Sequence, residues 1–130
     1  MDTWDAGAGS RKAQGDDAEQ RALVHLQRHG LSLVRRNYRV ARGPGARAGE
    51  VDLVMHDRDG TLVFVEVRMR RGASHGGAAA SVSVTKQRRL VFAAQHYLMR
   101  LPSPPPCRFD VVAIDGDRVE WLKAAFDAGT

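Results

Sequence analysis

The chain has 130 residues, of which 43% are hydrophobic, enough for one core and too few for two ordinary domains. Its formal net charge is +5, and no stretch reaches the roughly 18 to 20 consecutive apolar residues of a membrane span. The first residues lack the apolar run of a signal peptide, and the single cysteine, Cys107, cannot form an internal disulfide. We therefore expect one cytoplasmic domain without a membrane segment.

The positive charge is concentrated in three runs of basic residues, within residues 35–47, 68–71 and 86–89. Such clusters are typical of chains that contact phosphates, because each neutralised phosphate releases condensed counterions. Arginine greatly outnumbers lysine, so an arginine-favouring genome explains the charge equally well, and charged runs usually form solvated surfaces. Nucleic-acid binding is therefore a hypothesis at this point.

The first third of the chain predicts a tail, a helix and a strand. Residues 1–12 lack periodicity, and we expect a disordered tail ahead of a single domain at residues 13–130. Residues 15–29 carry apolar side chains at helical spacing and are followed by Gly30, a natural C-terminal cap. Residues 31–40 alternate loosely, which predicts a strand that the following Gly/Pro-containing segment ends.

Two stronger strand signals follow, at residues 50–56 and 61–69, where apolar side chains recur at every second position. Between them the sequence DRDG predicts a tight turn, so the two strands are expected to form a hairpin. The small and glycine-rich segment at residues 72–80 is too flexible to pack, and we expect a mobile loop there.

The last part of the chain predicts a helix and two strands. The helix is expected to begin near Ser83, a good N-cap, and to continue with an apolar stripe until the sequence LPSPPP ends it. Residues 108–114 and 118–122 then read as strands around the turn DGD. The resulting order α-β-β-β-α-β-β indicates an α/β fold.

Two carboxylates, Asp52 and Glu66, lie within the otherwise apolar hairpin strands, where a charge needs a partner. A three-residue loop would place Asp57 opposite Thr61, and because partner numbers keep a constant sum, Asp52 would then face Glu66. Directly opposed Cβ atoms lie about 4.5 to 5.5 Å apart, where like charges destabilise a sheet. A divalent cation removes this conflict, and Mg²⁺ prefers oxygen ligands of this kind.

Three further charged residues could join this pair. The period of two sends Arg68 to the Glu66 side of its strand. Glu19 lies next to the apolar stripe of the first helix, and Lys86 faces inward one turn before the stripe of the second. Simpler interpretations stay open. Glu66 pairs with Arg68 or another arginine, the Glu19 charge interacts with the helix dipole, and Lys86 is a solvated side chain.

Several short segments occur in a specific order and spacing. They are Gly15 with Glu19, the tripeptide Asn37-Tyr38-Arg39, GEVD at 49–52, FVEVRMR at 64–70, Lys86, RFDVV at 108–112, and Ala125-Phe126. Together they resemble the YraN family of uncharacterised bacterial proteins, which are predicted nucleases similar to Holliday-junction resolvases. The resemblance covers about residues 15–126 and implies a restriction-endonuclease-like α/β fold with a mixed central sheet.

The resemblance also implies a metal ion, Mg²⁺ or alternatively Mn²⁺, with three ligands: Asp52, Glu66 and the main-chain carbonyl near Val67. The residues it implies for catalysis are Glu19, Asp52, Glu66, Arg68 and Lys86. At position 68 the family has a lysine, which can lose its proton and help to activate water, whereas arginine stays charged. Lys86 is then the candidate to supply the missing function.

Three functions are compatible with these features. The first is a Mg²⁺-dependent endonuclease that hydrolyses phosphodiester bonds, with branched DNA as one substrate class. The second is a catalytically impaired DNA-binding or DNA-repair accessory module that lost cleavage through Arg68. The third is a protein-interaction domain, which would show no salt-sensitive nucleic-acid binding. A homodimer is a further expectation, because a resolvase-like enzyme must cut two strands.

Overall fold

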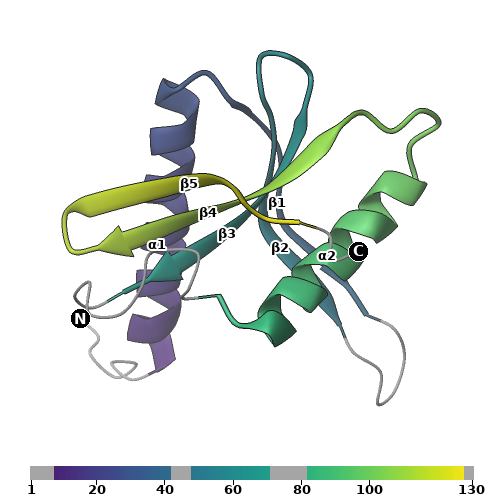
Figure 1. The fold of residues 1–130 in the computed structure, drawn as a ribbon. Coiled ribbons are helices and arrows are strands. Elements are labelled where there is room, and N and C mark those ends of the chain that lie inside the picture. Colours follow the sequence, from purple (N-terminus) through teal and green to yellow (C-terminus); the bar gives the residue numbers. More distant parts are fainter. Residues whose placement is uncertain (1–7, 42–47, 71–81, 128–130) are drawn as a thin grey trace.

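The computed structural model describes residues 8–41, 48–70 and 82–127, with side chains from residue 15 onward. Its elements, in chain order, are α1 (Ala8–Arg28), β1 (Ser32–Val40), β2 (Gly49–His56), β3 (Leu62–Met69), α2 (Val84–Met99), β4 (Cys107–Asp115) and β5 (Arg118–Phe126). This succession confirms the predicted order α-β-β-β-α-β-β (Figure 1).

The five strands form one sheet in which the spatial order follows the chain, from β1 to β5. Neighbouring strands are antiparallel except β3 and β4, which run parallel and are connected through α2. A parallel pair needs such a crossover, because a tight turn can only reverse the chain. The sheet is therefore mixed, and β3, the strand that carries Glu66, lies at its centre.

The two helices lie on opposite faces of the sheet (Figure 1). Alternate residues of β3 contact different helices: Val63 and Val65 belong to the core beneath α1, whereas Leu62 and Phe64 belong to the core beneath α2. Burial on both faces explains why this strand is apolar almost throughout, apart from the charges at its far end. Glu66 and Arg68 therefore lie at the edge of the core beneath α2, next to polar groups.

The beginning of α2 confirms the predicted cap at Ser83. The Ser83 backbone is extended, and its hydroxyl accepts a hydrogen bond of 3.1 Å from the Lys86 N–H. This arrangement satisfies one of the free N–H groups in the first turn of a helix. It also fixes the helical phase that turns Leu90, Ala93 and Ala94 into the core. None of the described helices combines the length and apolar composition of a membrane span.

Two predicted boundaries differ from the structure. Helix α1 begins at Ala8 rather than at residue 15, and residues 8–14 contain several good helix formers. Strand β5 continues to Phe126 rather than ending at residue 122. Beyond a register shift in its pairing with β4, Phe126 pairs with Phe109. The strand pattern alone did not predict this continuation. Residues 1–7 and the predicted loop at 72–80 lie outside the described residues.

Candidate metal and catalytic site

The β2–β3 hairpin has the predicted register. The Asp57 N–H donates to the Thr61 carbonyl at 2.9 Å, Gly60 has a φ of 89°, and the ladder continues to Leu53 and Val65. Asp52 and Glu66 lie one step beyond this last ladder pair, so they are not themselves a paired position. The Val67 N–H donates to Asp52 Oδ2 at 2.8 Å. A side-chain oxygen thus serves as acceptor where the regular ladder has ended.

Glu66 is a buried carboxylate with only 3% of its surface exposed. Burial, together with the neighbouring Asp52 carboxyl, raises the pKa of Glu66 to about 7, although the charges of Lys86 and Arg68 act in the opposite direction. Burial also raises the pKa of Asp52, against the lowering effect of the hydrogen bond from Val67. The two acids interact closely enough to titrate as a pair, and the site disfavours two negative charges.

Lys86 reaches Glu66 from α2, as its helical position predicted. Lys86 Nζ lies 3.3 Å from Glu66 Oε2, and its side chain stays 43% exposed while that of Glu66 is almost wholly buried. The ammonium group therefore lies between the buried carboxylate and solvent. Lys86 is thus partly solvated, as the simpler interpretation expected, and is also paired with Glu66. By contrast, Arg89 turns away and donates from Nε to the Ala48 carbonyl at 3.2 Å.

Glu19 on α1 is a third carboxylate, within electrostatic range of Asp52. Burial raises the pKa of Glu19, and the Asp52 charge raises it further, whereas Arg36 and a hydrogen bond from the Asn37 side chain lower it. Arg36 Nη2 is 3.9 Å from Glu19 Oε1, at the outer limit of an ion pair. The electrostatic influence of Asp52 on Glu19 indicates that the two carboxylates share one region of the molecule.

Asn37 is a residue of this region that the sequence analysis used only as part of a motif. It has a φ of 52° within β1, in the left-handed region that asparagine tolerates better than most residues. A hydrogen bond from its side chain lowers the pKa of Glu19, so Asn37 lies beside that carboxylate. The signal that could have revealed this role is an asparagine inside a strand pattern, where the residue is normally depleted.

Arg68 contributes a fixed positive charge near Glu66. Its Nε is buried, and no hydrogen-bond partner reaches it within the described part of the chain. Its charge acts on Glu66 only as one of the smaller influences on the pKa of that carboxyl. The simple pairing of Glu66 with Arg68 is therefore not the main contact, because Lys86 forms the ion pair instead.

The donor set at Asp52 and Glu66 fits a hard divalent cation. Glu66 Oε2 is buried and receives no hydrogen bond of good geometry from any described residue, despite the nearby Lys86 ammonium. Across residues 15–41, 48–70 and 82–127, no three His, Cys, Asp or Glu side chains are grouped to hold a metal ion. Two carboxylates suffice for Mg²⁺, which usually keeps several waters and takes its other oxygens from the substrate.

Sequence comparison decides the family. Residues 18–114 match the family described as "Uncharacterised protein family UPF0102". The chain belongs to UPF0102, the YraN family. It is 69% identical over 117 residues to a UPF0102 protein of Methylibium petroleiphilum, covering 90% of this chain and 96% of that one. It is 62% identical over 120 residues to a UPF0102 protein of Albidiferax ferrireducens, covering 92% and 91%.

The UPF0102 chain also resembles solved structures. One match is titled "Crystal structure of SSO0001", with 14% sequence identity and a TM-score of 0.46. The alignment covers 88% of this chain and 53% of that one, so this chain spans about half the length of the solved structure. The UPF0102 family itself is uncharacterised, and membership establishes no activity.

Proposed function

We propose that this protein is a Mg²⁺-dependent endonuclease that hydrolyses phosphodiester bonds in nucleic acid. The observation that carries the proposal is the buried Glu66 carboxylate, with Asp52 on one side and the Lys86 ammonium 3.3 Å away on the other. Buried acids with raised pKa values beside a lysine are typical of catalytic sites, because a purely structural core would avoid the cost of burying them. The family resemblance points in the same direction.

In this proposal Asp52, Glu66 and the main-chain carbonyl of Val67 would hold the metal ion. When bound, Mg²⁺ polarises a phosphoryl oxygen and makes water a better nucleophile. Lys86 and Arg68 place two positive charges beside Glu66, where they would stabilise the negative charge that develops on the phosphoryl group. Glu19, beside Asn37, would orient water from the α1 side.

Arg68 supports a second candidate function, a DNA-binding or DNA-repair accessory module that does not cut. An arginine stays protonated and cannot act as a base. Its buried Nε, which has no partner among the described residues, shows that the guanidinium is not simply a surface charge. The two candidates differ in whether Lys86 replaces the proton-transfer capacity that the family lysine would have at position 68.

The proposed partner is nucleic acid, with DNA as the first substrate to test. The formal net charge of +5 supports a polyanionic partner. Exposed arginines occur in several parts of the described structure: Arg28, Arg35, Arg39, Arg88, Arg100 and Arg118. A preference for branched DNA, a cytoplasmic location and an active homodimer rest on the family resemblance and sequence composition.

The proposal is tested by incubating labelled duplex, single-stranded and four-way-junction DNA with Mg²⁺, Mn²⁺ or EDTA. The proteins compared are wild type, Glu66→Gln, Arg68→Lys and the control Asp17→Asn, which changes an exposed carboxylate of α1. We expect wild type and Asp17→Asn to cut in either metal, EDTA to abolish cutting, and Glu66→Gln to lose at least about 100-fold in rate.

The outcomes separate the candidate functions. If wild type binds DNA without cutting and Arg68→Lys cuts, the accessory module is the better description. If Glu66→Gln cuts as fast as wild type, the site at Asp52 and Glu66 is not the catalytic one. If no variant binds or cuts, a protein-interaction role takes the place of both.

A further inference from the structure

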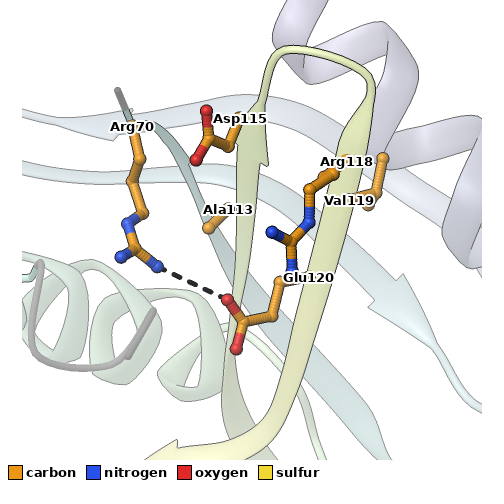
Figure 2. Close-up of a pocket in the computed structure, with 6 residues that line it drawn as sticks. All are labelled: Arg70, Ala113, Asp115, Arg118, Val119 and Glu120. Carbon is orange, nitrogen blue, oxygen red and sulfur yellow. Dashed lines mark hydrogen bonds and ion pairs between the residues drawn. The ribbon is translucent and has the colours of Figure 1, made fainter. Parts of the chain in front are cut away.

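A charged hollow lies beside the candidate site, beyond the end of β3. It encloses about 220 Å³ and is shown in Figure 2. Its lining residues come from the end of β3, from β4 and from β5: Arg70, Ala113, Asp115, Arg118, Val119 and Glu120. The metal and catalytic residues proposed above are absent from this lining, so the hollow is a separate feature of the surface.

The hollow and the candidate site share one face of the sheet. The Arg70 N–H donates to the Ile114 carbonyl at 2.8 Å, so the backbone keeps its strand geometry one residue past β3. Alternation then places Glu66, Arg68 and Arg70 on the same face, with roughly 6.6 Å between successive members along the strand. Ala113, the register partner of Arg68 on β4, lines the hollow and joins it to the site.

Arg70 is held against Glu120 across the width of β4. Arg70 Nη1 lies 3.4 Å from Glu120 Oε1, and the side chains are 11% and 53% exposed respectively. The guanidinium is thus positioned by its surroundings, whereas the carboxylate is open to water. Arg118 lies two residues before Glu120 and projects from the same region of β5 toward the hollow (Figure 2).

We propose that this hollow binds a backbone phosphate of the nucleic-acid strand that the candidate site cuts, and that the phosphate replaces Glu120 at Arg70. This inference rests on the proposed function, because the phosphate belongs to the same strand as the reacting phosphodiester. The ligand class is a phosphodiester anion. Its oxygens match the planar fork of a guanidinium, which can donate two parallel hydrogen bonds to them.

The charges of the hollow explain why an exchange is needed. In the free protein two arginines are balanced by two acids, Asp115 and Glu120, so an incoming anion finds no excess of positive charge. When Glu120 turns toward solvent, Arg70 and Arg118 outnumber the remaining Asp115. Because Glu120 is already half exposed, an ion pair of this kind contributes little stability and is easily exchanged.

The exchange predicts opposite effects for the two partners of the ion pair. Binding to a labelled DNA duplex is measured in EDTA, so that no strand is cut, over a series of salt concentrations. Arg70→Gln should weaken binding roughly tenfold or more and reduce the slope of log affinity against log salt by about 0.9. Glu120→Gln should strengthen binding several-fold, because the Glu120 carboxylate then no longer competes with the phosphate for Arg70.

Arg58→Gln is the matched control. Arg58 is exposed in the turn at the opposite end of β3, and its substitution removes the same charge from the molecule. We expect it to weaken binding far less than Arg70→Gln. Circular dichroism checks that each variant is folded, and if Arg70→Gln is not, the decision rests on whether Glu120→Gln strengthens binding more than Asp17→Asn, which removes an exposed negative charge elsewhere.

Two results overturn the phosphate subsite and leave the proposed cleavage standing: equal losses for Arg70→Gln and Arg58→Gln, or unchanged or weaker binding by Glu120→Gln. In both cases wild type still binds DNA and still cuts it in Mg²⁺. If wild type shows no salt-dependent DNA binding, the proposed function fails together with the subsite. Metal-dependent cutting by wild type is therefore measured on the same preparations, which distinguishes the two failures.

Discussion

Asp110 shows how one buried charge can organise an end of the molecule. It is fully buried and accepts hydrogen bonds from Arg108 Nε at 3.1 Å, Trp121 Nε1 at 3.0 Å and the Ala124 N–H at 2.9 Å. Arg108 also donates from Nη1 to Asp57 Oδ2 at 2.8 Å, and this bond is the main reason that the pKa of Asp57 is lowered. The network ties β4 to β5 and to the β2–β3 turn.

We predict that Asp110→Asn destabilises the protein strongly. The asparagine keeps the shape of the side chain but loses the charge that faces Arg108, and one of its two acceptor oxygens becomes a donor. Removing one member of a buried ion pair typically costs about 3 to 5 kcal/mol, and we expect a loss of about 3 kcal/mol here. Urea unfolding monitored by circular dichroism measures the change.

Asp117→Asn is the control for this prediction, because Asp117 is exposed in the turn between β4 and β5. Its effect should stay within about 0.5 kcal/mol, as for most surface substitutions. If Asp110→Asn is no less stable than Asp117→Asn, the hydrogen bonds to Asp110 do not contribute to folding in the way argued above.

Individual site residues were predictable to different degrees. Asp52 and Glu66 stood out because they are charges in strands with a clear period of two, and Lys86 followed from helical periodicity relative to Leu90. The Asp110 network could not be foreseen, because its partners Trp121 and Ala124 depend on how β5 pairs with β4. Ala124 has a φ of 50°, a conformation that no local signal in the sequence indicates.

At the scale of elements, Gly49 marks a close approach of β2 to α2. A Cβ atom added at Gly49 would lie 2.8 Å from Phe92 Cδ2 and 2.9 Å from the Ala93 nitrogen. The second of these is a backbone atom, so the helix itself would have to move. Because Asp52 follows on the same strand, and Lys86 lies on the same helix, this contact also sets the spacing within the candidate site.

We therefore predict that Gly49→Ala lowers the free energy of unfolding by about 1 to 3 kcal/mol, the usual range for overpacking. The matched control is Gly15→Ala in α1, where an added Cβ meets nothing within 4 Å. Alanine is the better helix former, so this second substitution should raise stability by about 0.5 to 1 kcal/mol. Urea unfolding of both variants tests the contrast, and destabilisation of equal size in both would contradict it.

The elements themselves were largely predictable where local chemistry defines them. The DRDG turn fixed the hairpin register, and Ser83 marked the beginning of α2. The parallel pairing of β3 with β4 is a different matter, because it depends on α2 crossing one face of the sheet. The family resemblance implied a mixed sheet, but no segment of the sequence indicated which two strands run parallel.

At the scale of the whole molecule, the candidate site costs stability when no metal is bound. Burial raises the pKa of Glu66 from its ordinary value of 4.5 to about 7, so the folded protein binds this proton more tightly than the unfolded chain does. The contribution of Glu66 to the free energy of unfolding is therefore most favourable below about pH 4.5. It is lost as the pH rises to about 7 and stays unfavourable above that.

This sign gives a prediction for Glu66→Gln in EDTA. The variant cannot ionise at this position. The free energy of unfolding of the variant, relative to that of wild type, should therefore increase as the pH rises from about 4.5 to about 7 and stay constant above that. Urea unfolding at a series of pH values measures it. Asp17→Asn, which changes an exposed carboxylate, should show no comparable trend.

Magnesium should reverse the order of stability of wild type and Glu66→Gln. A ligand that binds only the folded state stabilises it by about 2.7 kcal/mol at one hundred times its dissociation constant, and such a gain requires the charged carboxylate that the variant lacks. Wild type is therefore expected to be the more stable protein in Mg²⁺ at pH 8, although it is the less stable one in EDTA. Equal stabilisation of both proteins by Mg²⁺ would mean that the ion binds away from Glu66. A pH-independent difference in EDTA would mean that burial of the charge is not what the substitution relieves.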